Sequence, residues 1–507
     1  MAIAIADTEI PLWSATIVAL IIVLVVAGTV SLPGSREKGL PPGPPTVPFL
    51  GNINLLPKTG IHLLFTNWAK TYGSIFSVKI GHGTMVVLTS AYHATQLLDK
   101  RSAKYSHRPP SYVVGDLVFG GDHPMFMDPD ERWKLRRKLY FQLMNESRCN
   151  TEHVRLIEAE STKLLRDICL EPENVMQHPG RYTNSVISSL VCGMRTPRFD
   201  THHYVTLGKI MTDLSALGEI GATPPIDLLP ILKYVPERLM GYWRTRAANL
   251  NKLLLGLYHP LVDRLLERRQ KIGSIGGTDT TSTTLLVLIQ AMVTNLDVQL
   301  EAQKQIDSVV DEFTLPSWEH YDQLPLVSMI VKECLRWRPP LPGAFPHALA
   351  RDDEIDGMKI PQGSTIVLNI WGMHQDASRY SHPEKYDPYR YEGQTQPASA
   401  YTNSGHEKRD HFSYGAGRRI CPGIHLAERA LFVATARLLW AFTMKPKVDA
   451  DGKEVPIDTK PETAYKDGFL NQVRPFEVDV RVRSERRKET ILAAEAKAEV
   501  DVFSTYL

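Results

Sequence analysis

The chain has 507 residues, a hydrophobic content of 43% and a formal net charge of +2. This length allows a large buried core, and the balanced charge excludes a strongly basic nucleic-acid-binding protein. The five cysteines are odd in number, scattered along the chain and without a CxxC pair, which argues against a disulfide framework and a zinc site. We therefore expect a reducing, cytosol-facing body.

An apolar stretch lies near the start of the chain. Residues 12–32 contain no charged side chain, and roughly 20 apolar residues span a bilayer. Asp7 and Glu9 precede this stretch, whereas Arg36 and Lys38 follow it, so the positive-inside rule places the N-terminus in the lumen. A cleaved secretory signal would need a basic start and a shorter apolar core. We predict an uncleaved single-pass anchor ahead of a cytosolic body.

The elements that follow are predicted from local pattern. Closely spaced prolines between residues 40 and 48 form a stiff connector, either a plain spacer or a hinge that orients the body on a membrane. Gly81-His82-Gly83 lies between two β-rich runs and predicts a hairpin. Further helices are predicted over 131–143, 298–313 and 326–336, a strand over 366–370, and a solvated helical tail after the charged run 483–489.

The stretch from Ser413 to Gly423 is the most informative part of the sequence. In it, Cys421 lies among glycines and follows a pair of arginines. Thiolate is the form of cysteine that ligates metal, and nearby positive charge favours it. Glycines let the backbone approach a flat ligand, and Arg419 could pair with a carboxylate. This chemistry fits a fifth ligand of haem iron beside the propionates; a buried cysteine in a glycine-rich turn is the alternative.

This spacing resembles the haem-binding signature of the cytochrome P450 superfamily. The residues that carry the resemblance are Gly415, Gly417, Arg419, Cys421 and Gly423. The resemblance implies a single large P450 domain, mainly α with small β-sheets, in which these residues bind haem b and Cys421 ligates the iron. One position departs from the family pattern: Tyr414 stands where the family usually has Phe. A buried Tyr hydroxyl needs a hydrogen-bond partner.

Glu333 and Arg336 lie three residues apart on one face of a predicted helix. Alone, this spacing also fits a weak surface ion pair. The motif Pro388-Tyr389-Arg390-Tyr391 follows downstream. The family resemblance implies that Glu333, Arg336 and Arg390 form a buried triad that holds the cysteine loop in place.

Trp133 and Arg137 lie four residues apart and share a face of another predicted helix. An amphipathic surface helix would explain the same pattern. The resemblance implies that both side chains turn toward a haem propionate, and that His347 contacts a propionate as well. The remaining cations of this helix would stay solvated and could dock an acidic electron donor; they are Arg132, Lys134, Arg136 and Lys138.

The motif from Gly276 to Thr281 opens a predicted helix. Its threonines could simply cap that helix. The resemblance instead implies that the motif lies above the haem, where Asp279 and Thr280 deliver protons to bound oxygen. The family usually has many more residues before this motif, so a segment is missing from this chain and the distal roof over the haem is incomplete.

The motifs occur in the order found in the family, over the whole predicted cytosolic body. We divide the chain into an anchor (1–34), a proline-rich hinge (35–48), the catalytic domain (49–482) and a charged tail (483–507). The resemblance is to microsomal eukaryotic members, of the fungal type that decorates secondary metabolites. It implies a monooxygenase of the endoplasmic reticulum membrane that inserts one atom of O2 into a lipophilic substrate.

The same resemblance implies electrons from NADPH through NADPH-cytochrome P450 reductase. No Gly-rich dinucleotide fingerprint is present in the sequence, so NADPH is expected to bind the reductase. Two alternatives remain open: a haem-thiolate isomerase or dehydratase that needs no external electrons, and a catalytically impaired haem protein. The segments 105–126 and 201–258 are expected to shape the substrate site, but they carry no readable substrate code.

Overall fold

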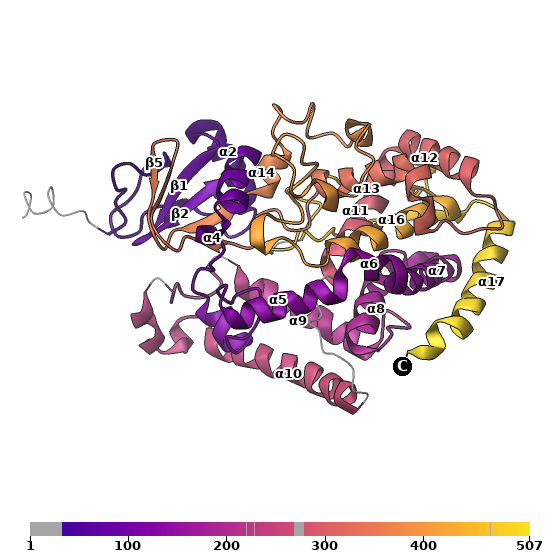
Figure 1. Ribbon diagram of the computed structural model, residues 1–507, viewed down its shortest axis with the longest axis horizontal. Coiled ribbons are helices and arrows are strands. Elements are labelled where there is room, and N and C mark those ends of the chain that lie inside the picture. The colour runs from indigo at the N-terminus through magenta and orange to yellow at the C-terminus, as the bar shows by residue number, and fades with distance from the viewer. Residues whose placement is uncertain (1–32, 220, 228, 268–277, 467, 507) are drawn as a thin grey trace, which may run out of the picture.

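The computed structural model describes residues 33–219, 221–227, 229–267, 278–466 and 468–506. Helices make up most of the molecule, and the strands gather at one end (Figure 1). This confirms the expected mainly α fold with small sheets. Residues 1–32, which hold the predicted anchor, lie outside the described residues. Within the described part, no individual helix is long and apolar enough to cross a membrane, and one pair, α11 with α12, meets the test jointly but bends by 105°.

The α-helices fall into two groups by length. Helices of 12 or more residues are α2 (Ile61–Tyr72), α5 (Glu131–Met144), α7 (Val154–Leu170), α8 (His178–Cys192), α9 (His202–Gly218), α10 (Trp243–Glu267), α11 (Thr278–Thr294), α12 (Leu296–Val309), α13 (Pro325–Trp337), α16 (Ile424–Ala441) and α17 (Glu485–Asp501). Shorter α-helices are α3 (Ala91–Ala94), α4 (Ser102–Tyr105), α6 (Glu146–Arg148), α14 (Ile370–His374) and α15 (Ala398–Tyr401).

The strands form three small sheets. The largest has the order β1-β2-β6-β3, from β1 (Ile75–Ile80), β2 (Gly83–Leu88), β6 (Thr365–Leu368) and β3 (His347–Ala348). The others pair β4 (Asp353–Ile355) with β5 (Met358–Ile360) and β7 (Phe442–Pro446) with β8 (Val478–Val482). The predicted hairpin is confirmed, because β1 and β2 are antiparallel with Ile80 opposite Gly83.

Both faces of the largest sheet are covered. Phe76 and Val78 point to one face and pack with Phe65 of α2, whereas Ile75 packs with Leu97 on the other. Successive side chains of a strand point to opposite faces, so a strand buried on both sides reads as a nearly continuous apolar run. The predicted strand 366–370 is shorter in the structure, because Asn369 caps α14 with its side chain and α14 begins at Ile370.

Helix α16 lies at the centre of the core. Nearly all of its residues are buried, and Leu439 and Trp440 are fully enclosed. It packs against α7, α11, α12 and α13, and its buried Arg429 and Arg437 are satisfied by hydrogen bonds to Asn150 and to the Pro316 carbonyl. Because α16 begins at Ile424, the cysteine loop enters directly into the most rigidly held helix of the domain.

Two sequence expectations need correction. The helix predicted over 298–313 is α12, which ends at Val309 because Val310 is extended. The tail does form a helix, α17, but it is not solvated on every side. Ile491 is fully buried, and α17 packs along α7 (Figure 1). The buried face of α17 consists of Ile491, Ala498 and Arg487, whose charge is paired with Asp307 at 2.8 Å.

Candidate haem-thiolate site

The cysteine loop is fixed by its own backbone. The Cys421 N–H donates to the Tyr414 carbonyl at 2.8 Å, which closes the loop between the two residues. Gly417 has φ +63°, a conformation that side-chain-bearing residues rarely adopt, and a Cβ there would run into the Leu98 carbonyl. Its N–H donates to Asp99 at 2.6 Å. Glycine is thus required at Gly417 by both conformation and space.

Opposing effects set the protonation of Cys421. Burial raises the pKa of its thiol, whereas the Gly423 N–H and the Arg137 guanidinium lower that pKa. The sulfur lies just before the N-terminus of α16, where the helix dipole also favours an anion. A metal ligated here would hold the sulfur as thiolate. All five cysteines are free thiols.

Three arginines and a tryptophan gather beside the loop. The Arg419 guanidinium lies 4.3 Å from the centroid of the Trp133 ring, and it donates to the carbonyls of Ser106, Pro124 and Met127. Arg137 donates to the Ile420 carbonyl, while its buried Nε has no partner among the described residues. The predicted pair on α5 and the predicted Arg419 are thus brought together, with Trp133 buried between the helix and the loop.

The charges of this cluster are not balanced by described carboxylates. Burial lowers the pKa of Arg137, and it lowers that of Arg419 to about 10. Burial, with repulsion from Arg419, lowers the pKa of Arg108 to about 9. Within the described residues, none of the three forms an ion pair, and each is bonded mainly to neutral carbonyls. These arginines are half-buried, and the one carboxylate that acts on them, Asp128 on Arg419, lies beyond ion-pair distance, so the cluster favours an anionic ligand.

His347 completes the cluster on strand β3. Its Nδ1 donates to the Tyr105 carbonyl at 2.7 Å, so Nε2 is left for a ligand. Burial, together with Arg108 and Arg419, lowers the pKa of His347 to about 3. A carboxylate placed beside Nε2 would reverse this effect and favour the protonated ring.

The residues of this cluster fit a haem. The Cys421 sulfur lies in a loop that requires glycine, and half-buried cations without an ion-pair partner among the described residues lie where carboxylates could bind. Arg108, Arg137 and Arg419 could hold the propionates, with Trp133 packed against Arg419. This fit rests on the residues themselves, including the unpartnered Arg137 Nε.

The predicted triad is a buried ionic group. Glu333 and Arg336 have no exposed surface, and Arg336 donates to both carboxylate oxygens at 2.8 and 2.6 Å. Arg390 donates to the same carboxylate at 3.2 Å. The remaining donors of Arg336 bond to the carbonyls of His374 and Pro383. Each guanidinium nitrogen of Arg336 thus has a hydrogen-bond acceptor, as a buried ion pair requires.

The triad is joined to the cysteine loop through two further side chains. His374 donates through Nδ1 to the Arg336 carbonyl at 3.0 Å and accepts the Phe412 N–H through Nε2 at 2.9 Å. Burial lowers the pKa of His374 well below its ordinary value, which keeps Nε2 free to accept. The Ser413 hydroxyl donates to the Leu335 carbonyl at 2.6 Å. Helix α13 therefore positions the residues that lead into the loop.

The distal motif lies in the first turn of α11. Gly276 and Gly277 fall outside the described residues, and α11 begins at Thr278. The Thr278 carbonyl accepts from Thr183 of α8 at 3.0 Å, and burial raises the pKa of Asp279 to about 6. Among the described residues, no hydrogen bond or ion pair connects Asp279 or Thr280 with the cysteine loop. The structure thus docks the motif on α8 without linking it to Cys421.

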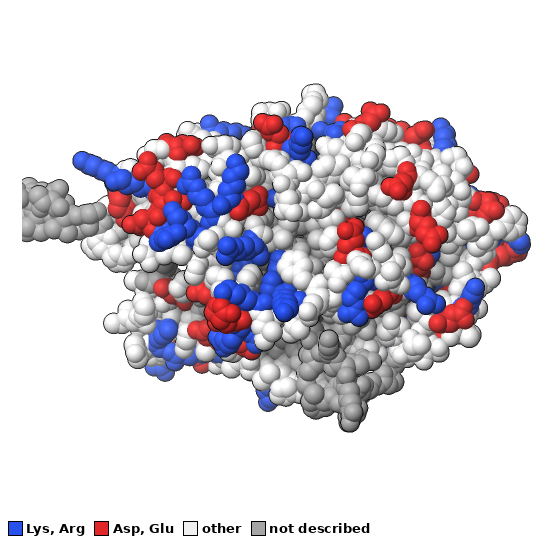
Figure 2. Space-filling model, viewed as in Figure 1, with Lys and Arg blue, Asp and Glu red and all other residues white. Residues whose placement is uncertain are grey.

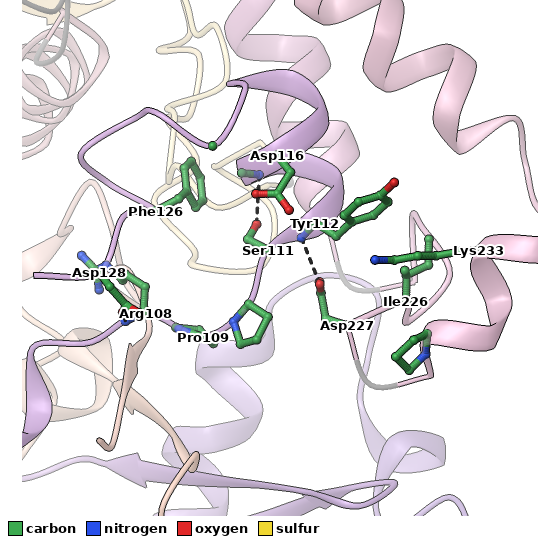
Figure 3. A pocket seen from close by; sticks show the side chains of 14 residues that line it. Arg108, Pro109, Ser111, Tyr112, Asp116, Phe126, Asp128, Ile226, Asp227 and Lys233 are labelled. Atoms are coloured by element: carbon green, nitrogen blue, oxygen red, sulfur yellow. Dashed lines mark hydrogen bonds between the residues drawn. The ribbon is translucent and has the colours of Figure 1, made fainter. Parts of the chain in front are cut away.

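A pocket of about 380 Å³ lies where the two expected substrate regions meet. Figure 3 shows Tyr112 on one wall and Ile226, Asp227 and Lys233 on the other. The Tyr112 N–H donates to Asp227 at 2.9 Å, and the Lys233 ammonium lies 3.6 Å from the centroid of the Tyr112 ring. Arg108 lines this pocket too, so the pocket adjoins the cationic cluster.

Comparison with known proteins decides the family. The sequence model of the family described as Cytochrome P450 matches residues 41–259 and 273–479. The chain belongs to the cytochrome P450 family. Cytochrome P450 monooxygenase anuE of Penicillium roqueforti is 59% identical, and the match covers 90% of this chain and 99% of the relative. Cytochrome P450 monooxygenase macC of Penicillium terrestre is 43% identical, with 93% and 94% covered.

These relatives identify the chain as a P450 monooxygenase, which carries haem on a cysteine thiolate. A solved zebrafish cytochrome P450 with abiraterone has the same fold, with a TM-score of 0.64, 21% identity, and coverage of 84% of this chain and all of the other. At that identity the likeness concerns the fold alone. Residues 41–479 span both the cysteine loop and the triad, so the family match includes the site described above.

The same comparisons locate a difference in this P450. The family match omits residues 260–272. The alignment with the Penicillium roqueforti relative extends over 486 residues but uses 90% of the 507 residues of this chain. The relative therefore has residues without a counterpart in this chain. The expectation that a segment before Gly276 is absent stays a prediction.

Sequence reasoning did not find Arg108, His374 and Ser413. Arg108 lies before two prolines, and nothing in its spacing marks it as a haem-facing cation. His374 and Ser413 act through single hydrogen bonds to backbone groups that only the fold brings near. Of these three residues, only Ser413 could have been found from the sequence, because it lies immediately before Tyr414 in the cysteine loop.

Proposed function

We propose that this P450 inserts one oxygen atom of O2 into a lipophilic organic substrate of fungal secondary metabolism. The proposal includes haem b as the cofactor and electrons from NADPH through NADPH-cytochrome P450 reductase. The observation that carries it is the Cys421 loop, closed by its own backbone and tied to the buried triad. The fungal monooxygenase relatives support the class of reaction.

Haem ligated by Cys421 supplies the activation of O2 and the oxidation of the substrate when it is bound. The residues of the chain would hold and orient it. Arg108, Arg137 and Arg419 neutralise the propionates, and the Gly423 N–H favours the thiolate of Cys421. On the other side, Asp279 has a pKa of about 6, which suits a carboxyl that takes up and releases protons near neutral pH.

The proposed docking surface for the reductase is the outer face of α5. Arg132, Lys134 and Lys138 are exposed there, beside Leu135 and Leu139, which are 60% and 44% exposed. Lys and Arg gather over α5 on the face shown in Figure 2. A basic surface with an apolar centre suits an acidic partner protein, because charge steers the encounter and apolar contact holds the complex.

The proposed location is the endoplasmic reticulum membrane, with residues 1–34 as the anchor and the body in the cytosol. Two described segments support contact with lipid. Residues 229–242 expose large apolar side chains, among them Ile231, Tyr234 and Leu239, and residues 47–55 expose Phe49. Both segments lie at the left end of the molecule in Figure 1. Exposed apolar groups of this kind favour a membrane surface.

The substrate is proposed to pass the pocket of Figure 3. The pocket joins the segment after Lys104 with residues 226–233, and its lining combines Phe126 and Ile226 with charged groups such as Asp116 and Lys233. The contacts of Tyr112 with Asp227 and Lys233 hold the two walls together. A ligand that enters would have to separate them or pass beside them.

A reduced carbon monoxide difference spectrum of the full chain tests the haem-thiolate assignment. We expect absorption at the thiolate-specific position. Its absence in well-folded, haem-loaded protein would sink the proposal. Metabolites of fungal strains with and without the gene would then identify the substrate class.

A second reading has a specific observation in its favour. The family match is interrupted at residues 260–272, shortly before the distal motif, and a segment missing at this place would leave a haem protein whose distal side is impaired. Such a protein would show the thiolate band but consume no NADPH with reductase and substrate. An isomerase or dehydratase would instead turn over its substrate without NADPH.

A further inference from the structure

Two charged side chains hold the glycine turns of the cysteine loop. Gly415 and Gly417 have φ +78° and +63°, so the backbone is left-handed at two positions shortly before the ligand. Asp99, on the short helix η2 (Thr95–Lys100), accepts the Gly417 N–H at 2.6 Å. Arg409 donates to the Gly415 carbonyl. Each glycine turn is therefore held by a side chain from outside the loop.

The same two side chains bond to each other. The second carboxylate oxygen of Asp99 accepts from Arg409 Nη1 at 3.4 Å. These contacts form a closed ring that runs from Gly417 to Asp99, on to Arg409, and back to the loop at Gly415. Arg409 is only 2% exposed, and its guanidinium lies 4.2 Å from the centroid of the Phe412 ring. We name Asp99 and Arg409 the loop clamp.

The loop clamp reaches the loop from other elements than the triad does. The triad is connected to the loop through α13, whereas Asp99 belongs to η2 and Arg409 to the segment ahead of the loop. The backbone at Arg409 is held in turn by Arg379, which donates to the carbonyls of Arg409 and of His406, the latter at 2.7 Å. None of the described hydrogen bonds of Asp99 or Arg409 involves a side chain of the triad.

We propose that the loop clamp is a second support of the cysteine loop and keeps haem iron on the Cys421 thiolate. The inference rests on the proposed haem-thiolate function. The clamped glycines lie between Tyr414, whose carbonyl accepts the Cys421 N–H, and Arg419, which is assigned to a propionate. If the glycine turns relax, both groups move, and the loop N–H groups no longer point at the sulfur. Asp99 and Arg409 are positioning residues, because they act through the loop.

The stability of the thiolate-ligated state tests the clamp. The haem-loaded full chain and its variants are compared by the rate at which the reduced carbon monoxide complex loses its thiolate-specific band in mild urea. Asp99→Ala removes two bonds and should speed this loss by roughly twentyfold, since one hydrogen bond corresponds to about fivefold. Asp99→Asn keeps an oxygen for the Gly417 N–H, so about fivefold is expected. Equal rates in the two variants would show that the Gly417 bond contributes nothing and would overturn the proposal.

Asp307→Ala is the matched control. The Asp307 carboxylate also joins two arginines, Arg483 and Arg487, the latter at 2.8 Å. None of its described bonds reaches the cysteine loop. This variant should speed the loss of the band by no more than about twofold. If it has the same effect as Asp99→Ala, the band reports general stability and the inference is wrong.

A double-mutant cycle shows whether the two residues act as one unit. Asp99→Ala and Arg409→Met should both speed the loss of the band, whereas charge alone would act on the thiolate in opposite directions. Because the two residues share one ion pair, the double variant should lose the band clearly more slowly than the product of the single effects predicts. Effects that multiply would show that Asp99 and Arg409 do not form a clamp.

Amide hydrogen exchange measures the loop directly, without turnover. The peptide that contains Gly415 and Gly417 should exchange faster in Asp99→Ala than in the wild type, because local opening becomes easier. The same peptide should be unchanged in Asp307→Ala. Wild-type protection that persists in Asp99→Ala would overturn the proposal. A wild type without the thiolate band would contradict the haem-thiolate function instead, and the exchange rates would still decide whether the clamp holds the loop.

Discussion

The two sides of the haem site are built differently. On the proximal side, Cys421 is fixed by hydrogen bonds that run from the loop to α13 and into the triad. On the distal side, the motif with Asp279 stands at the beginning of α11, and no described hydrogen bond connects it with Cys421. The family match leaves out residues 260–272 and resumes at residue 273, shortly before the motif.

This difference shows where the sequence tolerates change. The proximal loop is held by buried ionic and backbone groups, each of which would be left unpaired if its partner were lost. The distal motif depends on the helix that carries it. A deletion ahead of Thr278 can therefore leave the proximal half intact. Haem ligation by Cys421 and catalytic turnover then have to be measured separately.

The largest effect is expected at the ligand itself. Cys421→Ser should abolish the thiolate-specific band of the reduced carbon monoxide complex and all turnover, because no other described thiol lies in the loop. The measurement is the difference spectrum of the purified protein. Cys169→Ser, which changes a free thiol of α7, should leave the band in place. A band that survives in Cys421→Ser would show that another ligand holds the iron.

The next effect concerns the triad. Arg336→Met removes the two closest hydrogen bonds of the buried Glu333 carboxylate and leaves it with Arg390 as its only cation, which should destabilise the domain by about 3 kcal/mol. The yield of haem-loaded protein and its thermal midpoint measure this loss. The double variant Glu333→Gln with Arg336→Met removes both charges and should recover part of the stability. Equal losses in the single and double variants would argue against a charge effect.

On the distal side, Asp279 predicts a pH dependence. Burial raises its pKa from 3.8 to about 6, so the folded protein favours the protonated form. The stabilising effect is fully present below the unfolded pKa and is lost as pH rises through the folded value. Asp279→Asn should therefore gain stability relative to the wild type between about pH 4 and 6, by at most about 3 kcal/mol. The measurement is the thermal midpoint of both proteins across this pH range. If the Asp279 carboxyl were solvated, the midpoints of Asp279→Asn and the wild type would not diverge.

A chimera tests whether the missing segment matters. Residues 260–277 are replaced by the corresponding segment of the Penicillium roqueforti relative. If the distal side is impaired, NADPH consumption with reductase should rise by roughly tenfold or more, since proton delivery contributes at least that much. The thiolate band should be the same in both proteins. Full turnover by the unaltered chain would show that its distal side is not impaired.

The smallest effect is expected on α5. Lys138→Glu should slow reduction by the reductase about threefold at low salt, and the effect should fade at high salt. Rapid-mixing reduction kinetics measure it. Lys304→Glu, at an exposed position of α12, serves as the matched charge reversal and should change little. Equal slowing by both variants would point to overall charge instead of a docking surface.

Sequence pattern predicted the proximal side well because its chemistry is concentrated in short motifs. The spacing of Glu333 and Arg336 and the glycines around Cys421 each require particular residues at fixed separations. Arg108 and His374 could not be found in this way, since each acts through one contact that only the folded chain creates. The tail was misread because its charges outnumber its apolar residues. Ile491 and Ala498, seven residues apart, were the available sign of a buried face.

The position of helix α17 matters for folding during synthesis of the chain. Arg195 shares the buried carboxylate of Glu160 with Arg181, and its guanidinium lies 3.2 Å from the centroid of the Phe503 ring, just after α17. Most of the catalytic body, from residue 196 to residue 482, lies between Arg195 and Phe503 in the sequence. During synthesis, this ionic centre stays uncovered until residue 503 has left the ribosome. A premature stop shortly after Val482 would thus yield a chain with every haem motif and an open flank, suited to capture by chaperones.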